Sequence, residues 1–188
     1  VSMERIMVEF NKLMLSEKPS VGLKLLEESG ILSLIMPELT ALKGIEEVEG
    51  QTHKDNFWHT LEVVDNISKH TENLWLRWAA LLHDIGKAPT KKFVEGNGWT
   101  FHGHEFLGSK MVKSLFHRLK LPMGSDMKYV QKLVKLSSRP ISLIDDGTSD
   151  SALRRLLFDS GEDLEDLFTL CKADITTKNS SKQITTAC

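Results

Sequence analysis

Apolar residues recur at every third or fourth position along most of the chain, which is the spacing of one face of an α-helix. Short polar stretches with Gly or Pro separate the periodic segments. The pattern predicts helices over residues 2–15, 21–28, 31–36, 55–69, 74–85, 104–119, 127–136, 150–158 and 162–176. No segment shows a convincing two-residue alternation, so the sequence predicts an all-α fold.

Residues that cap helices stand at several of these boundaries. Ser2, Ser20 and Asp55 each precede a periodic segment, where a side-chain oxygen can accept hydrogen bonds from free backbone N–H groups. The stretches 44–52, 88–99 and 140–149 lack helical periodicity and are expected to be loops. The second of these contains enough Gly and Asn for a minimal hairpin.

The most apolar stretch reads LWLRWAALLHDIGK and ends in the adjacent pair His83 and Asp84. It is too short, and with Arg77 too charged, to span a membrane. His59 falls on a helical stripe with apolar residues, and so does Asp174. Burying a carboxylate without a partner costs several kcal/mol. Two His and two carboxylates turned inward therefore predict a site for a divalent metal ion.

Composition narrows the setting. With 188 residues and 40% hydrophobic content, the chain can bury one sizeable core. Cys171 and Cys188 lack metal-type spacing and form no disulfide framework, which favours a reduced, cytoplasmic compartment. The first residues do not resemble a signal peptide.

The formal net charge is only −2, but the charges are unevenly distributed. Residues 110–139 hold eight basic residues and one acid, whereas residues 140–166 hold eight acids and two Arg. This division indicates either an electrostatically polarised surface or two solvated helix faces.

The arrangement H…HD…D resembles the signature of the HD-domain metal-dependent phosphohydrolases. A longer likeness runs through ERIMVEFNKLM, PSVGLKLLEESGIL, PEL, HKDNFWHTLEVV, LRWAALLHDIGK, WTFHGHEFLGSKMV, SALRRLLFD and DLFTLCKADITTKN. Together these segments resemble the C-terminal, HD-containing half of a bacterial CCA-adding tRNA nucleotidyltransferase of the poly(A) polymerase family. The resemblance covers nearly the whole chain and implies an HD-domain helical bundle.

The resemblance also implies a division of the chain. Residues 1–50 resemble the RNA-binding or neck region of these enzymes, residues 51–178 resemble the HD domain, and residues 179–188 are expected to form a disordered tail. The Gly-rich, carboxylate-bearing segment of the nucleotidyltransferase domain has no counterpart here. We therefore interpret the chain as a fragment or truncated member that adds no nucleotides by itself.

In this family the metal ligands correspond to His59, His83, Asp84 and Asp174. They imply one divalent ion, which could be Mg, Mn, Ni, Co, Fe or Zn. Asp84 is also a candidate catalytic group that orients or deprotonates water. Lys87 is a second candidate, placed to meet a phosphate; the alternative is a solvated Lys after a helix.

Three further residues are candidates for a second metal or a phosphate contact. His104 matches a position that helps to form a second metal site in binuclear relatives. Those relatives commonly carry a His shortly before the RP pair, where this chain has Ser137, so one metal ion is expected. Arg154 and Arg155 face about 100° apart on one helix, so at most one is expected to reach a phosphate. Pairing with nearby acids is the alternative.

The basic segment suits an RNA backbone. Its candidate residues are Lys110, Lys113, Arg118, Lys120, Lys128, Lys132 and Lys135. No ordered aromatic series accompanies them, and Trp58, Trp75 and Trp78 are expected in the core. His53, His70 and His117 are expected to be surface or packing residues.

Two functional hypotheses follow. The first is a metal-dependent phosphohydrolase that acts on phosphomonoesters or 2′,3′-cyclic phosphates of nucleotides or RNA ends, within a protein involved in tRNA 3′-end processing. The second is a non-catalytic helical body that binds tRNA for an absent nucleotidyltransferase domain, with a structural or vestigial HD site. Neither hypothesis involves a membrane.

Overall fold

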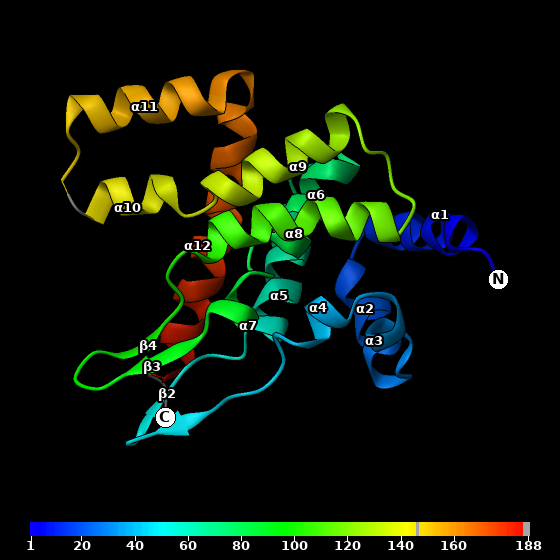
Figure 1. Ribbon diagram of the computed structural model, residues 1–188, viewed down its shortest axis with the longest axis horizontal. Helices are drawn as coiled ribbons and strands as arrows, with labels where there is room; N and C mark the ends of the chain where they lie inside the picture. Colours follow the sequence, from blue (N-terminus) through cyan, green and yellow to red (C-terminus); the bar gives the residue numbers. More distant parts are fainter. Residues whose placement is uncertain (146, 186–188) are drawn as a thin grey trace.

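The computed structural model describes residues 1–145 and 147–185, and it confirms the predicted all-α fold (Figure 1). The helices are α1 (Met3–Met14), α2 (Pro19–Glu28), α3 (Ile31–Ile35), α4 (Pro37–Thr40), α5 (Asn56–Ser68), α6 (Leu74–Leu82), α7 (Lys87–Thr90), α8 (His104–Arg118), α9 (Ser125–Leu136), α10 (Arg139–Asp145), α11 (Asp150–Ser160), the 3₁₀ turn η1 (Gly161–Asp163) and α12 (Leu164–Thr185). Two antiparallel pairs of short strands accompany them, β1 (Glu47–Val48) with β2 (Gln51–Thr52) and β3 (Lys92–Val94) with β4 (Gly98–Thr100).

Helix α6 is the centre of the bundle. It packs against α5, α9 and α12, and its residues from Leu76 to Leu82 are all buried. Each large apolar side chain that is buried in this way stabilises the fold by roughly 1.5–3 kcal/mol. Trp78 and Ala79 are fully enclosed, and Trp75 packs against the core at its edge, as does Trp58 on α5. The core placement expected for these three Trp residues is confirmed for Trp78, whereas Trp75 and Trp58 are only partly buried and pack against the core.

Arg77 is a buried cation within this apolar helix, only 3% exposed. Its guanidinium donates to the backbone carbonyls of Met14 (2.9 Å) and Ser16 (2.7 Å) at the end of α1, and to those of Ser68 (3.2 Å) and Thr71 (3.0 Å) at the end of α5. The last carbonyls of a helix have no partner within the helix. Arg77 therefore satisfies acceptors at the ends of two helices with one side chain.

Two of the three predicted caps are confirmed. Ser2 accepts from the backbone N–H of Arg5, and Asp55 accepts from two N–H groups at the start of α5. The predicted cap at Ser20 is wrong, because α2 already begins at Pro19, which needs no hydrogen bond at that position. Ser20 instead donates its N–H (2.9 Å) and its hydroxyl (2.5 Å) to Asp65 of α5.

The expected loops contain short regular elements. Residues 140–149 include most of α10, because a Pro is tolerated in the first turn of a helix, where its missing N–H has no partner to lose. Residues 44–52 contain β1 and β2, which sequence periodicity cannot reveal in strands of two residues. Residues 88–99 contain most of the β3–β4 hairpin and the end of α7.

Helices α10 and α11 project from the bundle as an arm (Figure 1). By contrast, the segments 1–50 and 51–178 contribute to a single hydrophobic core, in which the ring of Phe10 lies 5.2 Å from that of Trp78. Helix α12 continues to Thr185, into the segment where we expect a disordered tail, and residues 186–188 lie outside the described part. Among the described helices, none combines the length and the apolar character needed to cross a bilayer.

Candidate metal centre

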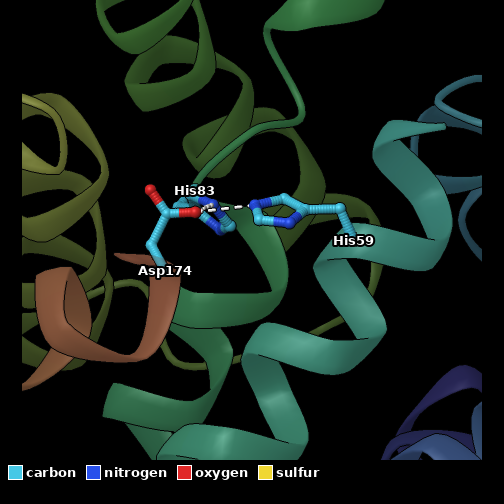
Figure 2. Close-up of side chains that lie close together, drawn as sticks. All are labelled: His59, His83 and Asp174. Atoms are coloured by element: carbon cyan, nitrogen blue, oxygen red, sulfur yellow. Dashed lines mark hydrogen bonds and ion pairs between the residues drawn. The ribbon is translucent and has the colours of Figure 1, made fainter. Parts of the chain in front are cut away.

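Three helices bring a candidate metal ligand to one point in the core. His59 lies on α5, just over one turn after its Asp55 cap, and His83 terminates α6 as its C-cap residue. Asp174 lies on α12, which packs against both α5 and α6. Figure 2 shows the three side chains pointing toward one another.

The distances are short. His59 Nε2 lies 2.6 Å from Asp174 Oδ1, and His83 Nε2 lies 3.7 Å from the same oxygen. One potential ligand atom from each of the three residues lies within 4.8 Å of the others. A divalent ion that took imidazole nitrogen and carboxylate oxygen at about 2.0–2.2 Å would require ligand atoms gathered in this way.

The surroundings of His83 test whether these residues fit an ion. Its Nδ1–H donates to the carbonyl of Ala80 at 2.6 Å, which turns Nε2 toward the cluster. Nε2 itself is buried and makes no well-formed hydrogen bond. It is the only such side-chain nitrogen or oxygen among the described residues. A buried polar atom in that state is costly, and coordination would satisfy it. The backbone partner on the other ring nitrogen is the usual support of a ligating His.

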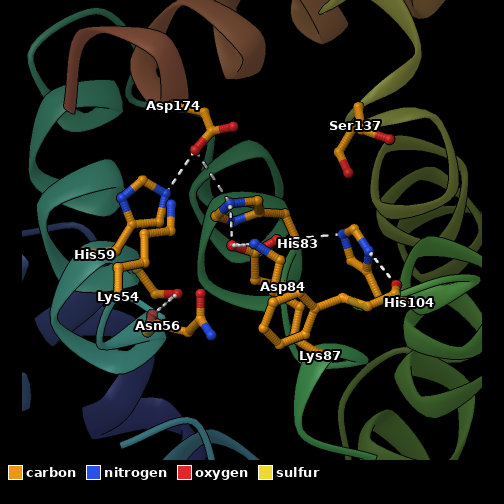
Figure 3. A network of polar contacts seen from close by, with 12 residues as sticks. Lys54, Asn56, His59, His83, Asp84, Lys87, His104, Ser137 and Asp174 are labelled. Carbon is orange, nitrogen blue, oxygen red and sulfur yellow. Dashed lines mark hydrogen bonds and ion pairs between the residues drawn. The ribbon is translucent and has the colours of Figure 1, made fainter. Parts of the chain in front are cut away.

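Asp84 lies next to this cluster and connects it to a second group of polar residues (Figure 3). One carboxylate oxygen, Oδ2, is 3.3 Å from His83 Nε2 and 3.1 Å from Lys87 Nζ. The other oxygen, Oδ1, is 3.5 Å from His104 Nε2. Asp84 is 4% exposed, so all of these contacts lie away from bulk water. The adjacent pair therefore presents two potential ligands, of which Asp84 also meets the candidate phosphate contacts.

Burial and charge oppose each other in the pKa values of the site. Burial alone would lower the pKa of His83, but the carboxylates of Asp84 and Asp174 outweigh it and raise the pKa to about 10. Burial would raise the pKa of both carboxyl groups, but their contacts with His and Lys residues hold it below the usual range. Burial lowers the pKa of His59 despite its hydrogen bond to Asp174. Without an ion, a positive His83 thus lies between two negative carboxylates.

We expect the metal-free protein to lose stability as the pH rises from about 6.5 toward 10. The folded pKa of His83 is above its unfolded value, so its contribution is complete below pH 6.5 and is lost on passing the folded pKa. The depressed carboxyl groups act in the opposite direction, and their contribution is lost only in acid. Urea denaturation of the chelator-treated protein at several pH values measures this. If the free energy of unfolding of His83→Gln falls with pH as steeply as that of the unaltered protein, His83 is not the cause of the loss.

Gly86 sets the distance between the His-Asp turn and α8. A Cβ atom at this position would lie 2.0 Å from the carbonyl oxygen of His104 and 2.8 Å from the backbone nitrogen of Gly108. Because both are backbone atoms, α8 can approach the turn only where a side chain is absent. This approach brings His104 within reach of Asp84, and Phe101 orients the His104 ring by accepting from its Nδ1–H at 3.0 Å.

Gly86→Ala is expected to destabilise the fold by about 1–3 kcal/mol, because no flexible side chain can move aside for the added methyl group. The urea denaturation midpoint measures the change. Gly124→Ala is the matched control, since a Cβ there meets nothing within 4 Å. Equal midpoints for the two variants would show that α8 can withdraw without cost.

The remaining candidates are not all near the cluster. Lys87 and His104 contact Asp84 beside the cluster, and Ser137 lies on the same side of the cluster as His104 (Figure 3). The Ser137 hydroxyl donates to the carbonyl of Val134 at 2.9 Å. Arg154 and Arg155 are exposed on the projecting α11, and neither makes an ion pair within the described residues.

The basic candidates divide into engaged and solvent-facing residues. Arg118 forms a two-pronged ion pair with Glu38, which ties α8 to α4, and Lys132 pairs with Asp163 at 2.8 Å. Lys110 lies over the ring of Phe106, 4.3 Å from its centroid. Solvent-facing positions are held by Lys113, Lys120, Lys128 and Lys135.

The structure adds residues that our interpretation of the sequence missed. Asn56 is 4% exposed and lies beside the cluster, as does Lys54 (Figure 3). Glu105 supports the far side, with Oε2 at 3.4 Å from His104 Nδ1 and a hydrogen bond from Ser138. The only sequence signal for Glu105 is its position beside His104, and that signal does not reveal which way the carboxylate turns.

Comparisons with known proteins agree with this geometry. The family model described as HD domain matches residues 56–176, and the model described as probable RNA and SrmB-binding site of polymerase A matches residues 1–43. Similar proteins include an A-adding tRNA nucleotidyltransferase of Deinococcus radiodurans, 34% identical, and a CC-adding tRNA nucleotidyltransferase of Thermus thermophilus, 32% identical. Each match covers 91% of this chain and 38% of the relative.

A multifunctional CCA protein of Pseudomonas fluorescens is 35% identical over 63% of this chain and 29% of its own length. The chain thus spans less than two fifths of the length of these relatives. It shares with them the HD-containing region. The HD model covers well over half of the chain, and the His and Asp residues of its signature meet in the core. This protein therefore belongs to the HD-domain family.

Proposed function

We propose that this chain is a divalent-metal-dependent phosphohydrolase for phosphomonoesters or 2′,3′-cyclic phosphates of nucleotides or RNA ends. The observation that carries the proposal is the buried cluster of His59, His83 and Asp174, in which His83 Nε2 lacks a well-formed hydrogen bond. Its relatives, which are tRNA nucleotidyltransferases, favour a role in tRNA 3′-end processing.

The ion would be held by His59, His83 and Asp174, with Asp84 as the neighbouring fourth ligand. When bound, it would polarise a phosphoryl oxygen and acidify a water molecule. The low pKa of Asp84 keeps its carboxylate ionised, so that it can hold a water in line with phosphorus and accept its proton as the new bond to phosphorus forms. The bond between phosphorus and the ester oxygen breaks in the same reaction, and the leaving oxygen takes up the proton that Asp84 received. The two oxygens of Asp84 already contact different partners, which fixes their directions.

Lys87 and His104 supply the remaining polar contacts. The Lys87 ammonium lies 3.1 Å from Asp84, where it can also neutralise a non-bridging phosphate oxygen. His104 Nε2 lies 3.5 Å from Asp84, and because its Nδ1–H is donated to Phe101, Nε2 can accept a hydrogen bond from a water that Asp84 holds. Ser137 contributes a hydroxyl in place of a stronger ligand beside His104. This donor set supports one metal ion and a phosphate rather than two metal ions.

Elemental analysis of the purified protein tests the metal site directly. We expect about one divalent ion per chain and hydrolysis of 2′,3′-cyclic AMP that requires Mn²⁺, Ni²⁺, Co²⁺ or Mg²⁺. The chelated protein serves as the blank. If neither cyclic nucleotides nor phosphomonoesters turn over with any of these ions, the hydrolase proposal fails.

RNA binding is a second candidate function, and α9 carries the observation that favours it. Lys128, Lys132 and Lys135 line one side of this helix, together with Arg139 at the start of α10, around an open hollow of about 380 Å³. Asp163 and Asp159 neutralise Lys132 and Arg139, whereas Lys128 and Lys135 remain exposed. The polymerase RNA-binding match to residues 1–43 supports the same function from another segment.

The double variant Lys128→Glu/Lys135→Glu is expected to weaken tRNA binding and to reduce its dependence on salt. Each phosphate contact that is lost lowers the slope of log K against log[salt] by about 0.7–0.9. Fluorescence anisotropy at several salt concentrations measures this slope. Lys69→Glu/Lys172→Glu changes the net charge equally, at exposed sites just after α5 and on α12, and is the control. Equal slopes for both doubles would remove α9 from the RNA interface.

A further inference from the structure

Four partly exposed rings gather on the two hairpins. His53, just after β2, lies edge-on to Trp99, with ring centroids 4.9 Å apart, and edge-on to Phe101 at 6.1 Å. Phe93 lies edge-on to Trp99 at 5.5 Å. All four rings are half-buried, and none belongs to the hydrophobic core cluster. We call these four residues the hairpin aromatic group.

The pairing of the short strands does not by itself fix the positions of these four rings. The strands contain two or three residues each, and the hairpins lie below α7 at the edge of the molecule (Figure 1). The indole N–H of Trp99 donates to the carbonyl of Gln51 at 3.0 Å, which joins one hairpin to the other and fixes the ring. The result is a small, oriented aromatic surface outside the main core.

This surface adjoins the candidate metal centre through Lys87. The Lys87 ammonium is 3.1 Å from Asp84 Oδ2 and 5.5 Å from the centroid of the Phe101 ring. A second lysine, Lys91, lies 5.9 Å from the centroid of the Trp99 ring and pairs with Glu46. The Lys87 ammonium thus lies between the place where a phosphate would bind and the hairpin aromatic group. A ligand that spans both must combine an anionic group with a flat one.

We propose that the hairpin aromatic group binds the base of the nucleotide, or of the RNA end, whose phosphate lies at the metal centre. This inference rests on the proposed hydrolase and adds a site that selects nucleosides. Stacking of bases on aromatic rings tolerates any base, because every base has a π-face. The site therefore recognises that a base is present rather than which base it is.

The test compares adenosine 5′-monophosphate with ribose 5-phosphate, which lacks only the base. Both are titrated into metal-free, ¹⁵N-labelled protein, and the Trp99 indole N–H signal is followed by NMR after assignment with Trp99→Phe. We expect adenosine 5′-monophosphate to bind about tenfold more tightly, within the range of one stacked base. Its addition should shift the Trp99 signal. Trp99→Leu should remove the preference, whereas Trp99→Phe, which retains a ring, should keep most of it.

Phe158→Leu is the control variant, because Phe158 is an aromatic residue 87% exposed on α11. It should leave both affinities unchanged. Equal affinities of the unaltered protein for the two probes, or no binding of either at millimolar concentration, would overturn the base site. This comparison needs no variant, so it holds even where Trp99→Leu disturbs the hairpin.

The two proposals fail in different ways. If adenosine 5′-monophosphate binds more tightly than ribose 5-phosphate but no phosphoester is hydrolysed with any of the metal ions, the base site stands and the hydrolase proposal fails. Hydrolysis of nucleotide and base-free phosphoesters with the same kcat/KM would leave the hydrolase and overturn the base site.

Discussion

Replacing Asp84 by Ala is expected to reduce phosphoester hydrolysis by roughly 10²–10⁴-fold, the contribution of a positioned acid or base. Asp84 is the residue that touches both the metal cluster, through His83, and the candidate phosphate contacts Lys87 and His104. Its loss removes the group that holds the attacking water, and it also leaves the buried His83 and the partly buried Lys87 without this carboxylate. Steady-state kinetics with 2′,3′-cyclic AMP and elemental analysis of the same preparation measure the two consequences.

Asp150→Ala is the matched control, since Asp150 is an exposed acid at the start of α11. It should keep both activity and metal content. A folded Asp84→Ala protein that hydrolyses the substrate at the unaltered rate would exclude Asp84 from the reaction. Loss of activity with full metal content would assign Asp84 to the water rather than to the ion.

Arg77→Met is expected to lower the free energy of unfolding by about 3–5 kcal/mol, because several backbone carbonyls lose their donor and each costs about 1–3 kcal/mol when it is left buried and unsatisfied. Met fills much of the volume but donates no hydrogen bond, so carbonyls at the ends of α1 and α5 lose their partner. For a domain of this size, each kcal/mol lowers Tm by about 2–4 °C. Thermal and urea denaturation, followed by circular dichroism, measure the loss.

The stability of Arg77→Lys should lie between those of the unaltered protein and Arg77→Met. An ammonium has only three donors and cannot reach all four carbonyls that the planar guanidinium contacts. Arg154→Met, at an exposed position on α11, should change stability by less than about 0.5 kcal/mol. An Arg77→Met protein as stable as Arg154→Met would mean that water replaces the guanidinium at these carbonyls.

Helical periodicity is sufficient to predict most of this fold and the three residues that meet in its core. His59 and Asp174 could be found because a polar residue on an apolar stripe must point inward. Their convergence with His83 could not be derived from spacing alone, because it depends on how α5, α6 and α12 pack. The resemblance to HD domains supplied that link, and the distances among the three residues agree with it.

Other features depend on partners that are distant in the sequence. The charge of Arg118 suggests an RNA contact, but Glu38, 80 positions earlier, holds its guanidinium. Arg77 is a charged residue in an apolar run, and only the ends of two other helices reveal its role. The hairpin aromatic group escapes periodicity altogether, because its rings come from strands too short to show a repeat.

The shared core has a consequence for how this part of the protein could be reused. Phe10, Met14 and Leu23 pack in the same cluster as Trp78 and Phe116, and Arg77 ties the end of α1 to the end of α5. A cut near residue 50 would therefore expose apolar surface on both pieces. The smallest portion that could be transplanted into another protein and still fold as a cooperative unit therefore includes residues 1–50 together with residues 51–178.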